Sequence, residues 1–177
     1  MILSPHNLDG VFSIFFEPKN DFRGEFTRVF CSEKFASNGL NTNWPQNNLS
    51  KTHLKGTIRG LHFQEAPAEE VKLVTCLSGE IFDVILDVRK GSKSFGKYLT
   101  TTLGEKHNKA LYIPAGHAHG FQTLSDDVTL LYWHSTNYSP NLESGVNPTD
   151  GELRILWPLE PTRISQKDKK LPNLREI

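Results

Sequence analysis

The sequence predicts an all-β fold, either a sandwich or a closed barrel, and a jelly roll is the form that we favour. About ten short segments alternate between apolar and polar residues, and turn residues separate them at near-regular spacing. The 13 glycines and 10 prolines are spread along the chain, as expected for many turns between short elements. Helical periodicity is scarce. A closed barrel has no exposed sheet edges and leaves an interior wide enough for a small ligand.

The N-terminal part of the chain predicts two strands. Residues 11–16 alternate as a strand does, and the polar run 17–21 would end that strand in a turn. Residues 24–30 alternate again, with Phe26 and Phe30 on one side.

Helices are predicted only at the periphery. Ser32 could cap a short helix that runs through Phe35 and stops at Asn38-Gly39. The last ~15 residues are polar and contain proline, so we expect a short helix or an ordered tail there.

The middle of the chain supplies most of the predicted strands. They are expected over residues 60–64, 72–77, 80–88, 97–103, 110–113, 120–124 and 128–135. Ser78-Gly79 is typical of a tight hairpin between two of these strands. Within 80–88, the odd-numbered residues from Ile81 to Asp87 share one face, and the even-numbered residues from Phe82 to Val88 share the other.

Length, charge and cysteine content limit the function. A chain of 177 residues has the usual length of one domain, so we treat 1–177 as a single domain. The 20 basic and 20 acidic side chains cancel, which argues against a dedicated nucleic-acid binder. No window approaches the roughly 18 apolar residues of a membrane span, and no secretory signal begins the chain, so we expect a cytoplasmic protein. Cys31 and Cys76 fit small buried hydrophobic residues better than a disulfide or a nucleophile.

The segment 59–64 is the strongest local candidate for a functional site. On a regular strand, His62 and Gln64 share one face, and Arg59 points to the opposite one. A histidine inside a β-barrel can act as a general base near neutral pH. The other interpretation is a core histidine whose hydrogen bonds are satisfied.

A second segment, 113–120, delivers two histidines after a tight turn. His117 and His119 are two residues apart, so on a strand they face the same side. The segment could form a ligand pocket, which we favour, a metal site, or a purely structural turn. A metal needs three or four ligands, and together with His62 the barrel offers three histidines at best. We therefore predict no metal.

Four further residues have a functional interpretation, a structural one, or both. Lys72 begins an apolar strand. If it faces inward, its burial is costly unless the charge is paired or used. The alternative is an edge lysine that protects the end of the strand from pairing with another chain. Tyr132 could act chemically or simply pack in the core. Asp168 lies in a polar tail, where a carboxylate is solvated by default. Arg23 lies on a predicted turn and suits the fork-like recognition of phosphate.

Several common catalytic motifs are absent. The sequence contains no P-loop, no G-x-G-x-x-G, no G-x-S-x-G elbow and no C-x-x-C. Nucleotide hydrolysis, Rossmann-type redox chemistry, serine hydrolysis and thiol exchange therefore have no support.

Taken in order, the segments between about residues 21 and 174 resemble the dTDP-4-dehydrorhamnose 3,5-epimerase family. The shared motifs are D-F-R-G-E-F from Asp21, Q-N-N-L-S from Gln46, I-R-G-L-H-F-Q from Ile58, G-E-I-F-D-V from Gly79, D-V-R-K-G-S from Asp87, I-P-A-G-H-A-H-G-F from Ile113, and S-Q-K-D from Ser165. One such motif would be weak, but this many in order is a specific signal. The resemblance implies a cupin jelly-roll barrel with short peripheral helices, usually a homodimer, that works on a nucleotide-diphospho-sugar without metal or cofactor.

The resemblance also implies the catalytic roles. Family members usually epimerise C3 and C5 of a nucleotide-linked 4-keto-6-deoxyglucose, and both carbons lie α to the C4 ketone. By position, His62 matches the family's general base, and Asp168 would hold and polarise it. Lys72 would stabilise the oxyanion at C4, and Tyr132 would return a proton on the opposite face of the ring.

Substrate contacts carry over in the same way. They are Arg23, Phe26, Arg28, Gln46, Asn48, Arg59, His119, Tyr138, Glu143 and Lys167. Arg23 and Arg59 would grip the diphosphate, and Tyr138 would stack on the base. In this family one subunit commonly contributes residues near Arg23 to its neighbour's pocket, so dimerisation would complete the site.

The sequence departs from the family pattern near the pocket, and this leaves the nucleotide base open. Arg28 replaces the usual Glu, and His117 replaces the usual Phe. Residues 148–151 lack the usual Trp and Pro. The alternatives are an epimerase that inverts only C3 or C5 of a different nucleotide sugar, a 3,4-ketoisomerase, a metal cupin, and a sugar-binding cupin without turnover.

Overall fold

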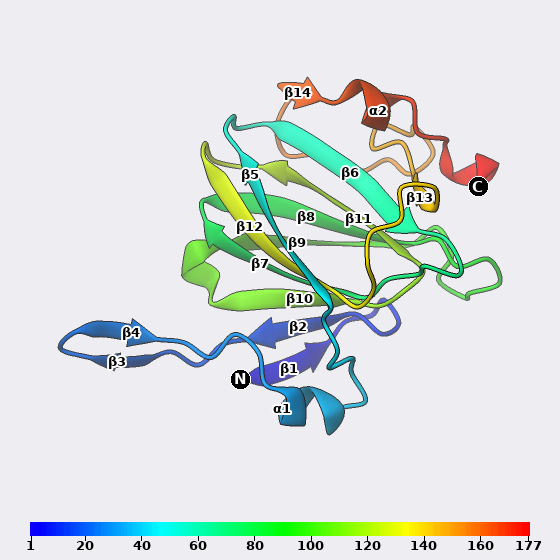
Figure 1. Ribbon diagram of the computed structural model, residues 1–177. Coiled ribbons are helices and arrows are strands. Elements are labelled where there is room, and N and C mark those ends of the chain that lie inside the picture. The colour runs from blue at the N-terminus through cyan, green and yellow to red at the C-terminus, as the bar shows by residue number, and fades with distance from the viewer.

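The computed structural model describes residues 1–177, and its regular secondary structure is almost entirely β-strand (Figure 1). The strands are β1 (Ile2–Pro5), β2 (Phe12–Phe15), β3 (Lys19–Asp21), β4 (Gly24–Phe26), β5 (Gln46–Thr52), β6 (Thr57–Gln64), β7 (Lys72–Ser78), β8 (Glu80–Asp87), β9 (Tyr98–Gly104), β10 (Lys109–Ile113), β11 (His117–Thr123), β12 (Val128–His134), β13 (Glu143–Gly145) and β14 (Arg163–Ile164). The helices are α1 (Ser32–Ala36) and α2 (Gln166–Lys169), with short 3₁₀ turns η1 (Glu105–His107) and η2 (Leu174–Glu176). The predicted all-β class with short helices is confirmed. No helix is long and apolar enough to cross a membrane.

The strands form two large sheets and a small arm. The first sheet has the order β1-β2-β10-β7-β12-β5, and the second has the order β13-β6-β11-β8-β9, with β14 beside β6. Neighbouring strands are antiparallel except for the pair β14–β6. Neither sheet closes on itself or joins the other through strand hydrogen bonds. The two sheets face each other as two layers, and β3 and β4 project as a separate ribbon (Figure 1).

The largest hydrophobic cluster lies between the two sheets. Val74 and Leu130 of the first sheet pack with Ile85 and Phe121 of the second, and all four are buried. Burying apolar surface contributes about 25 cal/mol per Å², so this layer is the main source of stability. Cys76 belongs to the same cluster, where burial raises the pKa of its thiol to about 11.

Both faces of the second sheet are covered, which explains the pattern of residues 80–88. Ile85 faces the central core, whereas Val84 and Leu86 pack on the outer side against Val146 and Leu153 of the C-terminal segment. The two predicted faces of this strand are confirmed. A strand that is buried on both faces has apolar residues at nearly every position, as residues 80–88 do at most positions.

The predicted hairpin at Ser78-Gly79 is wrong. Strand β7 belongs to the first sheet and pairs with β10 and β12, whereas β8 belongs to the second and pairs with β11 and β9. The turn therefore carries the chain from one layer to the other. Gly79 has φ +77°, and a Cβ there would lie 2.6 Å from the hydroxyl oxygen of Ser125. The glycine predicts a sharp turn, but it does not predict which strands β7 and β8 pair with.

The N-terminal expectations are confirmed only in part. The strand expected over 24–30 ends at Phe26, and it pairs with residues 19–21, which the sequence assigned to a turn. The helix near residue 32 is present, but Cys31 and not Ser32 is its N-cap residue, and no side chain caps it.

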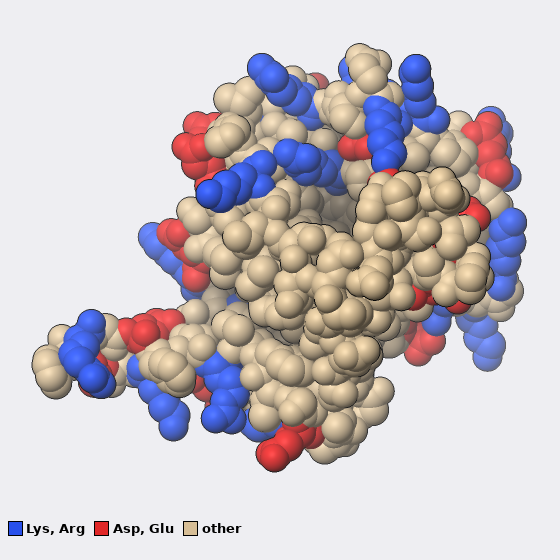
Figure 2. Space-filling view, in the orientation of Figure 1, with Lys and Arg blue, Asp and Glu red and all other residues tan.

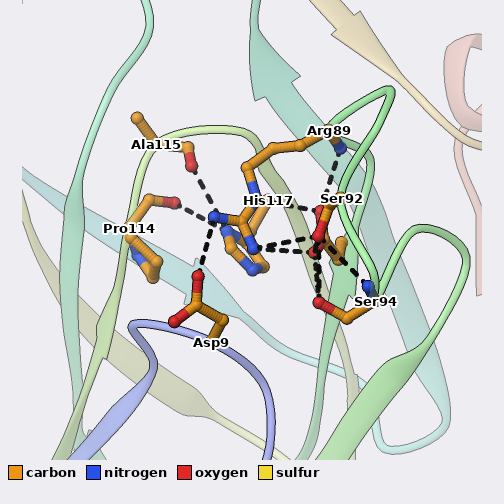
Figure 3. Close-up of polar contacts among 8 residues, drawn as sticks. Asp9, Arg89, Ser92, Ser94, Pro114, Ala115 and His117 are labelled. Atoms are coloured by element: carbon orange, nitrogen blue, oxygen red, sulfur yellow. Dashed lines mark hydrogen bonds and ion pairs between the residues drawn. The ribbon is translucent and has the colours of Figure 1, made fainter.

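The buried carboxylate of Asp87 organises one end of the second sheet, where Arg89, Ser92 and Ser94 gather (Figure 3). Asp87, the last residue of β8, accepts hydrogen bonds from Arg89 Nη2 at 2.7 Å and from the hydroxyls of Ser92 and Ser94, each at 2.7 Å. Burial opposes ionisation of Asp87, but the hydrogen bonds from Arg89 and Ser94 outweigh it and hold its pKa well below the usual range. This carboxylate ties the loop after β8 to the sheet.

His117 belongs to this end of the sheet and not to a ligand pocket. Its Nδ1 lies 3.2 Å from the carbonyl oxygen of Pro114 and 3.3 Å from that of Ala115 (Figure 3). Burial lowers the pKa of His117. Although His117 and His119 are two residues apart on β11, only His119 reaches the large cavity.

Candidate active site

A cavity of about 1160 Å³ lies between the two sheets and the C-terminal segment. Only 6 of its 26 lining residues are hydrophobic, so it suits a polar ligand. Figure 2 shows the hollow, with Lys and Arg side chains gathered along its upper edge. Strands β5, β7 and β12 form one wall, β6 and β11 form the other, and the segment around α2 lies over them.

Most of the predicted site residues meet in this cavity, although they come from segments far apart in the sequence. They are Gln46, Asn48, Arg59, His62, Lys72, His119, Tyr132, Tyr138, Glu143, Lys167 and Asp168. Arg23, Phe26 and Arg28 are not among them, because they lie on or beside the β3–β4 arm. Phe26 and Arg28 line a small separate pocket with Met1 and Lys34. A single chain therefore does not bring these three residues to the cavity.

An irregularity in β6 aims both Arg59 and His62 into the cavity. On a regular strand these two residues would face opposite sides, but the register with β11 shifts between the pairs His119–His62 and Phe121–Arg59. Such a bulge re-aims a side chain. The two strands also approach closely here, because a Cβ on Gly60 would lie 2.6 Å from the Cα of Gly120. The expectation that Arg59 points away from His62 is therefore wrong.

His62 and Asp168 form a hydrogen-bonded pair. Asp168 Oδ1 lies 2.8 Å from His62 Nε2, and the hydroxyl of Ser165 accepts from the backbone N–H of Asp168 at 3.0 Å. Burial opposes ionisation of Asp168, but the hydrogen bond and charge of His62 outweigh it and lower the pKa of Asp168. The carboxylate therefore accepts a hydrogen bond from the N–H at His62 Nε2. In the neutral ring Nδ1 then carries the lone pair, and it has no protein partner.

Tyr132 lies on the opposite wall, because it belongs to β12 of the first sheet whereas His62 belongs to β6 of the second. Its ring meets that of His119 edge to face, with the centroids 5.9 Å apart. Burial, and then the negative charge of Asp83, raises the pKa of Tyr132 well above its ordinary value. The phenol therefore keeps its proton at neutral pH and can act as a donor.

Lys72 is buried in the cavity wall and is not a solvated edge lysine. Its Nζ donates to the carbonyl oxygen of His62 at 2.9 Å and pairs with Glu70 Oε1 at 3.0 Å. The first contact joins β7 of one sheet to β6 of the other. A paired ammonium group is thereby placed beside the histidine that could remove a proton.

His119 is the second buried histidine of the cavity. Its Nε2 lies 2.8 Å from Asp83 Oδ2, and Asp83 is fully buried on β8. His119 lines the cavity, where the sequence predicted it. No group of three or more His, Cys, Asp or Glu side chains is arranged to hold a metal ion.

The mouth of the cavity combines an aromatic ring with several cations. The hydroxyl of Tyr138 and the ammonium of Lys167 both bind Glu143 Oε2, and the lysine contact measures 2.5 Å. The backbone N–H of Tyr138 donates to Gln46 Oε1 at 2.8 Å. Half of Tyr138 remains exposed, so its ring is free to stack on a planar ligand.

Sequence reasoning missed four residues of the cavity that carry charge or can carry it, namely Glu70, His134, Arg163 and Lys169. The sequence held a signal for two of these, because Glu70 precedes Lys72 by two residues and His134 follows Tyr132 by two. Residues at this spacing share a face of a strand. Each could therefore have been predicted to face the same side as a candidate site residue. Arg163 and Lys169 belong to the C-terminal segment, whose approach to the cavity has no local signal.

Comparison with known proteins agrees with this site. The family model described as dTDP-4-dehydrorhamnose 3,5-epimerase matches residues 5–176. A dTDP-4-dehydrorhamnose 3-epimerase of Streptomyces niveus is 38% identical over 170 residues, which cover 96% of this chain and 82% of that protein. A dTDP-4-dehydrorhamnose 3,5-epimerase of Shigella flexneri is 40% identical over 158 residues, which cover 88% of this chain and 87% of that protein.

Solved structures give the same result. The crystal structure of dTDP-4-dehydrorhamnose 3,5-epimerase from Bacillus anthracis, with TDP and PPi bound, matches with a TM-score of 0.94 at 34% identity. The match covers 97% of this chain and 98% of that one. The chain therefore belongs to the dTDP-4-dehydrorhamnose 3,5-epimerase family of isomerases.

Proposed function

We propose that this enzyme epimerises a nucleotide-diphospho-4-keto-6-deoxy sugar at C3 and C5, with dTDP-4-dehydro-6-deoxyglucose as the expected substrate. The observation that carries the proposal is the pairing of His62 with Asp168 on one wall and the protonated Tyr132 on the other. Inversion at carbon needs a base on one face of the ring and an acid on the opposite face. A site built only for binding needs neither.

The reaction begins with removal of a proton from C3 or C5. His62 Nδ1 takes this proton, and the electron pair of the C–H bond moves towards the C4 oxygen to give an enolate. Asp168 stabilises the histidinium that results. The ammonium of Lys72 stabilises the negative charge on the C4 oxygen.

Tyr132 then donates its phenolic proton to the carbon from the opposite wall, and the C4 ketone is restored. The new C–H bond lies on the other face of the ring, so the centre is inverted. Each inversion leaves one proton on His62 and a phenolate at Tyr132, and exchange with water resets both before the second centre reacts. A well-placed base or acid contributes about 10²–10⁴-fold to the rate.

The charges at the mouth fit the rest of the substrate. Arg59, Lys167 and two further cations, Arg163 and Lys169, line the cavity, and such side chains bind a diphosphate well. Tyr138 would stack on the base, and its half-exposed ring at the cavity supports this role. The bound TDP and PPi in the Bacillus anthracis relative support this assignment.

We infer that residues 1–177 are a single domain of the cupin jelly-roll type and that it works as a homodimer. The arm supports a dimer, because Phe22 is 98% exposed and Phe26 is 75% exposed. Large apolar side chains on a projecting ribbon are typical of an interaction site. In the dimer the arm would bring Arg23, Phe26 and Arg28 to the neighbour's cavity.

Proton NMR in D₂O tests the reaction. The purified protein is incubated with dTDP-4-keto-6-deoxyglucose, and the C3 and C5 proton signals are followed. We expect both signals to disappear. Loss of one signal would assign a single-carbon epimerase, a reaction for which the Streptomyces niveus relative is named. Loss of neither signal with this substrate and with GDP- and CDP-linked ketosugars would favour a sugar-binding protein without turnover.

A further inference from the structure

A chain of three charged or polar side chains runs along the wall of the first sheet. Lys72 Nζ lies 3.0 Å from Glu70 Oε1, and the other carboxylate oxygen of Glu70 lies 2.7 Å from His134 Nδ1. All three residues line the cavity. The proposed chemistry uses Lys72 but leaves Glu70 and His134 without a role.

The members of this chain are withdrawn from solvent. The side chains of Lys72, Glu70 and His134 are only 8%, 10% and 13% exposed. Burial opposes ionisation of Glu70, but the hydrogen bond from His134 and the charge of Lys72 outweigh it and lower the pKa of Glu70. Glu70 is therefore a carboxylate, and it accepts a hydrogen bond from each of its two neighbours.

The two contacts of Lys72 leave one of its hydrogen-bond donors free. An ammonium group has three N–H bonds. The carbonyl oxygen of His62 accepts one at 2.9 Å, and Glu70 accepts another at 3.0 Å. One N–H remains for a ligand in the cavity, and the two occupied bonds fix its direction.

The proposal rests on the function proposed above. We propose that Glu70 and His134 are positioning residues for the reaction: Glu70 directs the remaining N–H of Lys72 at the C4 oxygen of the substrate, and His134 holds Glu70 in place.

His134 makes a second contact, which ties the chain to the acid. Its ring stacks on that of Tyr132, with the centroids 5.8 Å apart and the planes 14° apart. His134 therefore touches both the residue that orients the oxyanion donor and the residue that returns the proton.

The contacts around Glu70 argue against a merely structural role. The chain next to it is already fastened to the end of β12, because Val71 N–H donates to Ser135 Oγ at 2.8 Å and Ser135 N–H donates to Val71 O at 3.0 Å. These bonds do not need the Glu70 side chain. Its removal should therefore affect Lys72 more than the fold.

The first test compares Glu70→Gln with Glu69→Gln. The first variant keeps the shape of the side chain and removes its charge, whereas Glu69 is exposed and makes no hydrogen bond or ion pair. We expect Glu70→Gln to lower kcat for C–H exchange about tenfold to a hundredfold with KM within about twofold, because a small misplacement of a catalytic group costs this much. Glu69→Gln should leave both parameters unchanged. An unchanged kcat in folded Glu70→Gln would overturn the proposal.

A second pair of variants separates the two contacts of His134. His134→Asn can keep a donor towards Glu70 but loses the ring, whereas His134→Phe keeps a ring on Tyr132 but loses the donor. If His134 acts through Glu70, the Asn variant should retain kcat within a few fold, and the Phe variant should lose about tenfold or more. The reverse order, or equal activity in both variants, would contradict the proposal. Thermal unfolding of each variant identifies any that fails to fold.

The same measurements separate failure of this proposal from failure of the proposed function. If the wild-type protein exchanges no C–H proton in any nucleotide ketosugar, the epimerase function fails and this proposal fails with it. If the wild-type protein exchanges protons and the variants keep its kcat, only the roles of Glu70 and His134 are wrong.

Discussion

Tyr132 keeps its proton because of where it lies. Burial and the charge of Asp83 raise the pKa of its phenol well above the ordinary value, so the group stays neutral from neutral to moderately alkaline pH. The neutral phenol already carries the proton that the proposed mechanism returns to the carbon, so no earlier protonation step is needed. The neutral phenol is a poor base, and the proposed mechanism therefore assigns the two proton transfers to different side chains on different walls.

This division of roles predicts the behaviour of Tyr132→Phe. His62 and Asp168 are untouched, so removal of the substrate proton in D₂O should continue. Inversion should fall by about 10²–10⁴-fold, because no acid remains on the opposite face. NMR of the product separates exchange from inversion. Tyr98→Phe is the matched control, since Tyr98 donates only to the carbonyl of Arg154 and lies outside the cavity. An unchanged product ratio in Tyr132→Phe would remove the acid role from this residue.

At the residue scale, the sequence predicted which side chains meet but not how they are aimed. Motif resemblance selected His62, Lys72 and Tyr132, and all three line the cavity. Strand alternation, however, placed Arg59 opposite His62, because a bulge is a property of two strands and not of one. The sequence assigned no role to Glu70, because its contact with His134 of β12 is long-range and has no local signal.

At the scale of elements, the sequence predicted the strands of the core well and the short peripheral ones poorly. Strands buried in a sheet carry strong apolar patterns, as β8 does. Strand β5 is mostly polar and exposed, and β13 and β14 have only three and two residues. These segments become strands because β12 and β6 offer free edges, and this long-range pairing has no local signal.

The loop after β8 yields a stability prediction. Asp87→Asn should lower the free energy of unfolding by about 2–4 kcal/mol at pH 7, because Arg89 and two hydroxyls lose a buried carboxylate. Asp9→Asn is the matched control. Asp9 pairs with the same arginine from an exposed position, where an ion pair contributes about 0–1 kcal/mol.

The pH dependence of this difference has a definite sign. The pKa of Asp87 is lowered in the folded state, so its contribution is fully present above the unfolded pKa of about 4. It should disappear as the pH falls from there through the folded pKa. Urea unfolding of both proteins between neutral and acid pH measures this. A difference that grows on acidification would contradict the role of the buried carboxylate.

At the scale of the whole molecule, the arm is the part that a single chain does not explain. The β3–β4 arm projects from the body (Figure 1). Arg23 and Phe26, which it carries, do not line the cavity of their own chain. The local sequence predicted a turn with an arginine suited to phosphate at Arg23, but it held no signal that this segment projects from the body. A homodimer in which each arm completes the neighbour's cavity accounts for both observations.

Mixing of subunits tests this arrangement. Arg23→Ala and His62→Ala should each have little activity alone. In a mixed dimer, however, one cavity has an intact His62 and receives an intact arm. Random pairing of equal amounts makes about half of the dimers mixed, with one working site in each, so we expect about a quarter of wild-type activity. His62→Ala mixed with Asp168→Ala is the control. It should recover nothing, because both residues line the cavity of the same chain. Full activity of Arg23→Ala alone, or no recovery in its mixture with His62→Ala, would show that the arm does not serve a neighbouring site.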